Sequence, residues 1–192
     1  MGLLEIVYWV GMLMEVMIRW PLRKHWRNTP KVEQRSTWQE KVMLQFLALG
    51  MLYLPVVYSV TDWLDFADYH LPGWMGGVGV YLMVCAVIIF GRAHVDLKKN
   101  WSPYQEIYKG HTMVTTGIYR YIRHPMYASQ WVWCLAQLLL LQNWLAGPLG
   151  LLLFIPFYRL RVRGEEKMML DTFGNKYKDY MRRTGSIFIK MK

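Results

Sequence analysis

The chain has 192 residues, of which 54% are hydrophobic, 16% aromatic and only 19% charged. This composition is too apolar for a disordered chain and disfavours an ordinary soluble globule, and two cysteines are too few for a disulfide scaffold. A formal net charge of +10 fits either nucleic acid or the anionic face of a membrane, so the positions of the charges decide between them.

Apolar stretches in the first half of the chain predict three transmembrane helices, because a hydrocarbon core needs about 20 residues of helix. The first stretch, 3–20, lacks the basic start and the small-residue cleavage site of a signal peptide, so we expect it to stay attached and to span. Residues 42–61 and 69–91 carry no charge and predict the second and third spans.

A third uncharged run, 124–158, predicts a tight hairpin of two helices. Its 35 residues would form one helix of about 50 Å, which is too long for a core of about 30 Å. We expect the turn at residues 142–144 or near Gly147 and Pro148. The two arms of about 15 to 17 residues would barely span the core.

The basic residues fall on one side of these five predicted spans. The 61–73 loop carries aspartates and no lysine or arginine, whereas all 23 lysines and arginines occur in three segments: seven in 19–41, six in 91–123 and ten in 159–192. The positive-inside rule therefore predicts a multi-pass integral membrane protein with its N-terminus outside and its C-terminus in the cytoplasm. Orientation and attraction to anionic lipid then explain the charge, and nucleic-acid binding is disfavoured.

The first segment that could carry chemistry is 109–127, where polar, aromatic and turn-forming residues precede the hairpin. Pro125 suits the first position of a helix, because its missing N–H would be unsatisfied there, and it pushes His124 toward an extended conformation. Alternatively, Arg123, His124 and Pro125 form an interfacial helix start with a snorkelling arginine.

The second such segment is 159–170, directly after the last predicted span. Arg161 and Glu165 are four residues apart and would lie on the same face of a helix. Alternatively they form a surface ion pair, which contributes only a few tenths of a kcal/mol. Because both segments lie at the predicted cytoplasmic face, a pocket between them is expected.

Other chemistry finds little support in the sequence. The five histidines show no metal-ligand spacing, and Cys85 and Cys134 fall inside predicted spans, so no protein-bound metal is expected. No dinucleotide loop, P-loop or nucleophile elbow occurs.

The motifs in these segments resemble those of the isoprenylcysteine carboxyl methyltransferase family of integral membrane enzymes, in a prokaryotic-type form. The resemblance covers roughly 105–190. Its motifs, in order, are His111-Thr-Met-Val114, Gly117-x-Tyr119, Arg123-His-Pro-x-Tyr127, Arg161-x-x-x-Glu165-Glu166 and Phe173-Gly-x-x-Tyr177-x-x-Tyr180.

This resemblance implies that S-adenosylmethionine binds in a cytoplasmic-side pocket and leaves as S-adenosylhomocysteine after its methyl group passes to the carboxylate of a prenylated cysteine. Arg161 would face the acceptor and, with Glu165, have a catalytic role. Where relatives commonly have glycine two residues after the motif tyrosine, this chain has Ser129, so local packing is expected to differ. The expected cofactor-binding residues are His111, Thr112, Met113, Val114, Tyr119, His124, Pro125, Met126, Tyr127 and Glu165.

The resulting fold expectation is an all-α membrane protein in two regions. Residues 1–100 would hold three transmembrane helices and their loops. Residues 101–192 would form the catalytic region, with the cofactor motif, the helical hairpin and cytoplasmic C-terminal helices that close the pocket. A lateral opening between helices would admit a lipophilic acceptor.

The proposed chemistry also has a physical basis. Opposite charges cancel when a sulfonium donates its methyl group to a carboxylate, so a poorly solvated pocket should favour the reaction. The carboxylate needs no general base, because it is ionised at neutral pH. Arg161 could hold it with forked donors.

Three alternatives remain open. A phospholipid, amine or thiol methyltransferase shares the motifs, but an ammonium acceptor wants a base or carboxylate near it rather than Arg161. An NADPH-dependent sterol-reductase-like protein would be much longer than this chain. A non-catalytic membrane scaffold would bind no cofactor.

Overall fold

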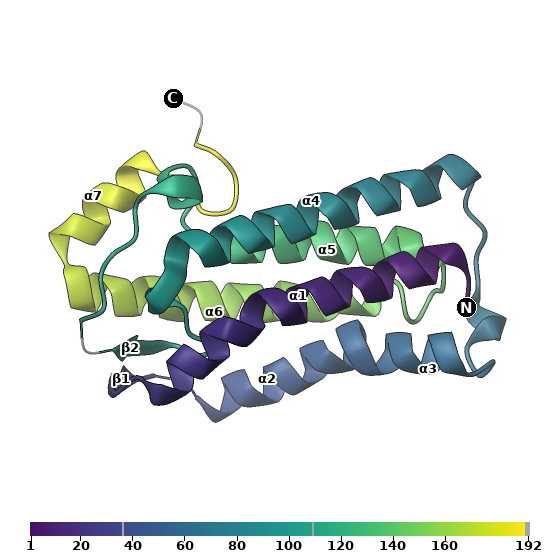
Figure 1. Ribbon diagram of the computed structural model, residues 1–192, viewed down its shortest axis with the longest axis horizontal. Helices are drawn as coiled ribbons and strands as arrows, with labels where there is room; N and C mark the ends of the chain where they lie inside the picture. The colour runs from purple at the N-terminus through teal and green to yellow at the C-terminus, as the bar shows by residue number, and fades with distance from the viewer. Residues whose placement is uncertain (36, 109, 191–192) are drawn as a thin grey trace.

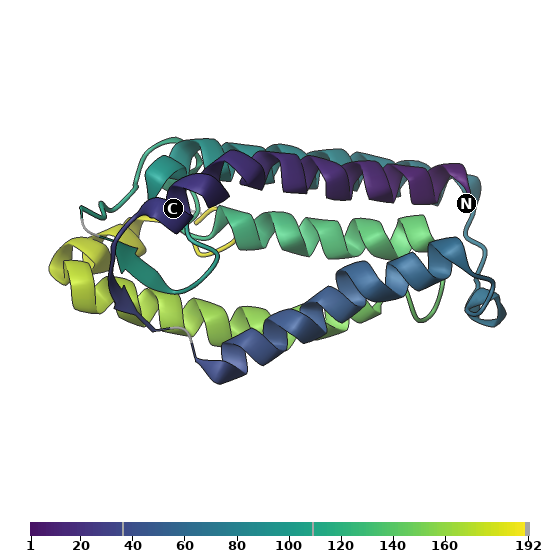
Figure 2. The ribbon, with the colours of Figure 1, turned by 60° about the horizontal axis from the view of Figure 1, so that its bottom comes forward.

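The computed structural model describes residues 1–35, 37–108 and 110–190, and it is an elongated bundle of long helices (Figure 1). Lys109 and Lys192, at the ends of expected segments, lie outside the described residues. Helices α4 and α5 pack against each other and α1 packs on both, while α2 packs on α6 (Figures 1 and 2). The bounds are α1 Leu3–Asn28, α2 Trp38–Ala48, α3 Leu54–Val60, α4 Gly73–Leu97, α5 Pro125–Leu141, α6 Leu149–Phe173 and α7 Asn175–Arg183.

Two helical segments are long and apolar enough to cross a membrane, namely Trp38–Val60 and Gly73–Leu97. The first joins α2 to α3 through a π-helical turn, η1 (Leu49–Tyr53). Large apolar side chains on both segments face outward, including Phe46 and Ile88, as lipid-facing residues do. The three other expected crossings are helical, as α1, α5 and the first part of α6, and they stay predictions as crossings.

The predicted hairpin of 124–158 is confirmed. Helix α5 ends at Leu141, Gln142 adopts a left-handed conformation with φ of 42°, and α6 begins at Leu149. The Asn143 side chain holds this turn: its Nδ2 donates to Leu64 O and to Asp68 Oδ1, both at 2.8 Å. The turn is thereby fixed to the loop that follows α3.

A buried amide links the middle of the bundle. Gln137 on α5 donates to Gly50 O at 2.8 Å and to Ala146 O at 2.7 Å, and its Oε1 accepts from the Tyr8 hydroxyl at 3.3 Å. Gly50 also lies against the backbone of Gly150, so close that a Cβ would be 3.0 Å from its nitrogen. These contacts tie η1 firmly to the hairpin.

The expectation of an all-α fold is wrong in one detail. Strands β1 (Lys31–Gln34) and β2 (Glu106–Tyr108) form a two-stranded antiparallel sheet. Each strand is too short to show a period of two in the sequence, and neither would form without a partner far along the chain. The sheet joins the two regions that were expected on either side of residue 100.

Candidate functional site

The loop from His111 to Tyr119 is held against the end of α4 by two side chains. Asn100 Oδ1 accepts from Thr112 N at 3.0 Å, and Asp96 Oδ2 accepts from Ile118 N at 2.8 Å. Gly117 has φ of 61°, and a Cβ there would overlap the Asp96 carboxylate. The loop therefore needs a glycine at this position for both backbone and steric reasons.

The start of α5 is held by the C-terminal tail that follows α7. Arg123 N donates to Gly185 O at 2.8 Å, and His124 N donates to Ser186 O at 3.0 Å. The Arg123 guanidinium donates to Met181 O at 3.3 Å and to Thr184 O. Pro125 is the first residue of α5, as the sequence predicted. Arg123 thus has more partners than a snorkelling arginine would need.

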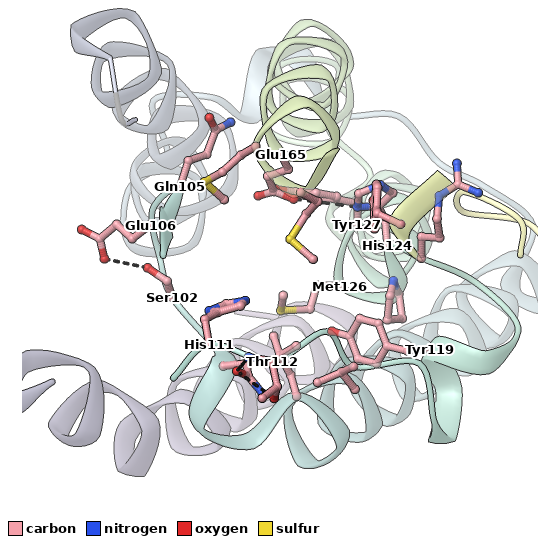
Figure 3. Close-up of a pocket in the computed structure, with 18 of the residues that line it drawn as sticks. Ser102, Gln105, Glu106, His111, Thr112, Tyr119, His124, Met126, Tyr127 and Glu165 are labelled. Carbon is pink, nitrogen blue, oxygen red and sulfur yellow. Dashed lines mark hydrogen bonds and ion pairs between the residues drawn. The ribbon is translucent and has the colours of Figure 1, made fainter. Parts of the chain in front are cut away.

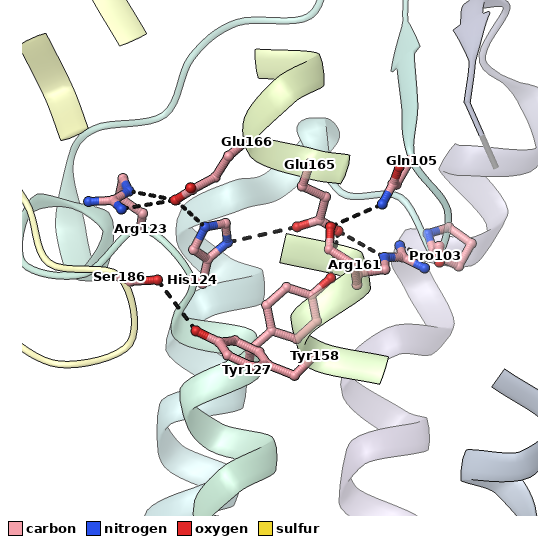
Figure 4. A network of polar contacts seen from close by, with 10 residues as sticks. All are labelled: Pro103, Gln105, Arg123, His124, Tyr127, Tyr158, Arg161, Glu165, Glu166 and Ser186. Atoms are coloured by element: carbon pink, nitrogen blue, oxygen red, sulfur yellow. Dashed lines mark hydrogen bonds and ion pairs between the residues drawn. The ribbon is translucent and has the colours of Figure 1, made fainter. Parts of the chain in front are cut away.

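Two adjacent glutamates of α6 both lie near His124, and their other partners differ (Figure 4). Glu166 Oε1 accepts from Arg123 Nη2 at 2.9 Å and lies 3.1 Å from His124 Nε2. Burial raises the pKa of Glu166, but the hydrogen bonds and charges of His124 and Arg123 outweigh it and hold that pKa below the usual value. Glu165 Oε1 accepts from the Tyr127 hydroxyl at 2.5 Å and from Arg161 Nε at 2.9 Å.

Arg161 is not in an exposed surface pair, because only 6% of its side chain is exposed. Besides Glu165, its guanidinium donates to the Glu40 carboxylate of α2 and to Pro103 O at 2.9 Å. Gln105 donates to the Arg161 carbonyl at 3.0 Å. Burial opposes the charge of Arg161, but Tyr127 and the two carboxylates outweigh it and hold its pKa above the usual value.

A pocket opens between the His111–Tyr119 loop, the start of α5, α6 and α7 (Figure 3). It encloses about 820 Å³, open solvent at its mouth included. The expected cofactor residues that line it are His111, Thr112, Val114, Tyr119, His124, Pro125, Met126, Tyr127 and Glu165. Met113 instead lines a groove of basic side chains beside α7, because neighbouring residues of an extended loop point to opposite sides. Arg161 lies behind Glu165 and lines a different cavity.

The pocket has polar and apolar walls. The Tyr119 hydroxyl is buried and has no hydrogen-bond partner among the residues that the structure describes, which is unusual unless a ligand supplies one. Burial lowers the pKa of His111 and so favours the neutral form of its ring. Val114, Met126 and Met168 supply apolar surface. These residues therefore fit a ligand with both a polar and an apolar part. Within the described residues, no group of three side chains could hold a metal ion.

Sequence reasoning missed Glu40, Gln105 and Asn100. Glu40 follows Thr37 by three residues, and Thr37 Oγ1 accepts from its backbone N at 3.2 Å. That spacing indicates a helix cap and says nothing of a partner 121 positions away. Gln105 and Asn100 have no sequence signal at all.

The chain is similar in sequence to known methyltransferases. The sequence model of the isoprenylcysteine carboxyl methyltransferase (ICMT) family matches residues 79–171. Protein-S-isoprenylcysteine O-methyltransferase of Tribolium castaneum is 27% identical over 139 residues, covering 68% of this chain and 50% of that protein. The Schizosaccharomyces pombe protein of the same name is 32% identical over 112 residues, covering 57% and 44%. The chain thus spans about half the length of these relatives.

A solved structure shares the fold. The eukaryotic intramembrane Ras methyltransferase ICMT superposes with a TM-score of 0.55 at 23% identity, covering 82% of this chain and 54% of the other.

Proposed function

Residues 79–171 match the model of the isoprenylcysteine carboxyl methyltransferase family, and we propose that the chain is a member of this family and a membrane methyltransferase that uses S-adenosylmethionine. The acceptor is the carboxylate of a lipophilic molecule such as an S-prenylated cysteine. The observation that carries this proposal is the buried pair of Arg161 and Glu165, which places an anion-binding guanidinium directly behind the wall of the pocket.

The pocket residues fit the proposed cofactor. When bound, S-adenosylmethionine supplies a methyl group on a sulfonium cation. Glu165 Oε2 lies 3.8 Å from His124 Nδ1, which is too far for a good hydrogen bond. This oxygen would therefore accept a hydrogen bond from the amino group of S-adenosylmethionine. The Tyr119 hydroxyl would gain the partner that it lacks. Val114 and Met126 would cover the adenine and keep water away from the reacting groups.

Arg161 would hold and align the acceptor carboxylate. Its planar guanidinium offers forked donors that match a carboxylate, and the carboxylate needs no base because it is already ionised. Alignment is then the main catalytic task of the chain. The lining of the cavity on the Arg161 side includes the apolar residues Met43, Phe157 and Leu160, which suit a lipid chain.

We further propose five spans with the N-terminus outside and the C-terminus in the cytoplasm. The site lies at the end of the bundle that carries α7 and the sheet, and the aspartate-containing loop after α3 lies at the opposite end (Figure 1). This separation of charge supports the orientation that the positive-inside rule gives.

A second candidate is methylation of a lipid amine. Two carboxylates, from Glu40 and Glu165, pair with the single guanidinium of Arg161. This excess of negative charge suits a cationic acceptor.

Calorimetry and a turnover assay test these proposals. Purified protein should release heat with micromolar S-adenosylhomocysteine and should methylate a prenylcysteine analogue. Turnover of phosphatidylethanolamine alone would favour the second candidate. No heat at high micromolar ligand would indicate a non-catalytic scaffold.

A further inference from the structure

Glu40 is an acidic residue in an unusual place. It lies in the first turn of α2, and only 9% of its side chain is exposed. Its carboxylate accepts from Arg161 Nη1 on α6, on the side of the guanidinium away from Glu165. A carboxylate with so little exposed surface is costly unless it has a partner, and Arg161 is that partner.

The positive charge of Arg161 is already balanced, so it does not neutralise a further anion. One guanidinium already faces two carboxylates, from Glu40 and Glu165, and also donates to Pro103 O at 2.9 Å. A third buried carboxylate beside it would meet repulsion from the first two. An acceptor carboxylate can therefore bind Arg161 only if one of the two glutamates leaves.

The surroundings of the two glutamates identify the one that leaves. Glu165 is four residues from Arg161 on the same helix and is also held by the Tyr127 hydroxyl at 2.5 Å. Glu40 comes from α2, and no residue of that helix, all of which the structure describes, is fully buried. Glu40 is thus the more easily displaced.

At its other end, helix α2 continues into a buried turn. The π-helical turn η1 follows it directly, and there Gly50 and Met51 are buried and Gly50 packs against the backbone of α6. Such π-helical turns are frequent at functional sites and local kinks. Figure 2 shows α2 extending beyond this turn toward the end of the bundle that holds the site.

Polar and apolar residues both line the space between α2 and α6. A cavity there encloses about 570 Å³, its open mouth included. Its polar lining residues include Glu40, Arg161 and Gln105, and its apolar lining residues include Met43, Phe157 and Leu160. A carboxylate joined to a long apolar chain would match both kinds of residue.

We propose that this cavity is the binding site of the acceptor carboxylate, and that Glu40 occupies the acceptor's position on Arg161 until the acceptor displaces it by an outward movement of α2 about η1. This inference rests on the proposed function. Glu40 is accordingly a positioning residue, which keeps Arg161 oriented and neutralised in the absence of acceptor. Its presence lowers the apparent affinity for acceptor, because only the open fraction binds.

Glu40→Gln tests the proposal in the full-length protein. If the open state is about a tenth of the population, the KM for a prenylcysteine carboxylate should fall about tenfold, while kcat and S-adenosylhomocysteine affinity stay unchanged. Glu33→Gln is the matched control: it removes the same charge at the same end of the bundle, from a residue that pairs with Arg35, and it should leave KM unchanged. A KM that stays the same or rises in Glu40→Gln would overturn the proposal.

A second measurement does not depend on that variant folding. Spin labels at the exposed positions Lys41 on α2 and Lys167 on α6, in a Cys85→Ala background, should move apart when a non-reactive acceptor analogue is added. An unchanged distance at saturating analogue would overturn the movement. If the unlabelled wild-type protein binds S-adenosylhomocysteine but methylates no prenylcysteine, the proposed function fails instead.

Discussion

Arg161 and Glu165 are neighbours on one helix turn, but they face different spaces. Glu165 lines the proposed cofactor pocket, whereas Arg161 lines the cavity beside α2. The two side chains meet through Arg161 Nε and Glu165 Oε1 at 2.9 Å. Because each faces a different proposed ligand, substitutions should affect the binding of those ligands differently.

Arg161→Lys and Glu165→Gln should therefore have separable effects. Lysine keeps the positive charge between Glu40 and Glu165, but it lacks the planar forked donors of arginine. Because the acceptor carboxylate would no longer be aligned, kcat should fall by roughly two orders of magnitude. S-adenosylhomocysteine affinity should be retained in this variant. Glu165→Gln should weaken that affinity about tenfold or more, as expected for a lost charged hydrogen bond. Calorimetry and steady-state kinetics measure both, and equal modest effects would contradict the assignment.

The carboxylate of Glu166 makes the stability of the fold depend on pH. Its pKa in the folded protein is held below the usual value by His124 and Arg123. A lowered carboxyl pKa stabilises the fold above the unfolded pKa of about 4.3, and that stability is lost as the pH falls through the folded pKa. Glu166→Gln should lower the melting temperature at pH 7 and flatten its decline below about pH 5.

Thermal melts between pH 4 and pH 7 measure this effect. Asp179→Asn is the control, because Asp179 is half-exposed on α7 and lies 3.5 Å from Arg182, and it should keep the wild-type decline. An unchanged decline in Glu166→Gln would contradict the role of this carboxylate.

At the scale of elements, the His111–Tyr119 loop depends on one glycine. Gly117 and Gly110 both have positive φ, at 61° and 82°, but only Gly117 has a close neighbour, the Asp96 carboxylate. That carboxylate also accepts from Ile118 N at 2.8 Å. Any side chain at residue 117 must therefore displace the group that fixes the loop to α4.

Gly117→Ala and Gly110→Ala separate backbone strain from this clash. Both variants should lose about 1–2 kcal/mol of unfolding free energy from the left-handed conformation. Gly117→Ala should lose more, and it should also bind S-adenosylhomocysteine more weakly because the loop shifts. Thermal unfolding and calorimetry measure the two quantities. Equal losses in both variants would show that Asp96 does not hold the loop.

At the scale of the whole molecule, the two ends of the bundle differ in charge. The loop after α3 contains aspartates and no lysine or arginine, and the opposite end carries α7 with its lysines and arginines. If the bundle spans a membrane as proposed, these ends lie on opposite sides.

Cysteine labelling tests this orientation. In a Cys85→Ala background, a single cysteine replaces Trp63, which is 76% exposed, or Arg182, whose side chain is 77% exposed. A membrane-impermeant maleimide should label position 63 in intact cells and position 182 only after permeabilisation. The reverse pattern would contradict the proposed orientation.

The sequence by itself determined the features that depend on local pattern. The uncharged run 124–158 predicted the hairpin, Pro125 predicted the start of α5, and the four-residue spacing predicted the contact between Arg161 and Glu165. Hydropathy and helical periodicity are properties of neighbouring residues, so they can be seen without the fold.

Only the tertiary structure decided which distant residues meet at these features. It brought Glu40 to Arg161 across 121 positions, paired β1 with β2, laid the C-terminal tail against Arg123, and turned Met113 away from the pocket. Such contacts are set by how whole helices pack and by which side of a loop faces inward, and no short stretch of sequence contains that information.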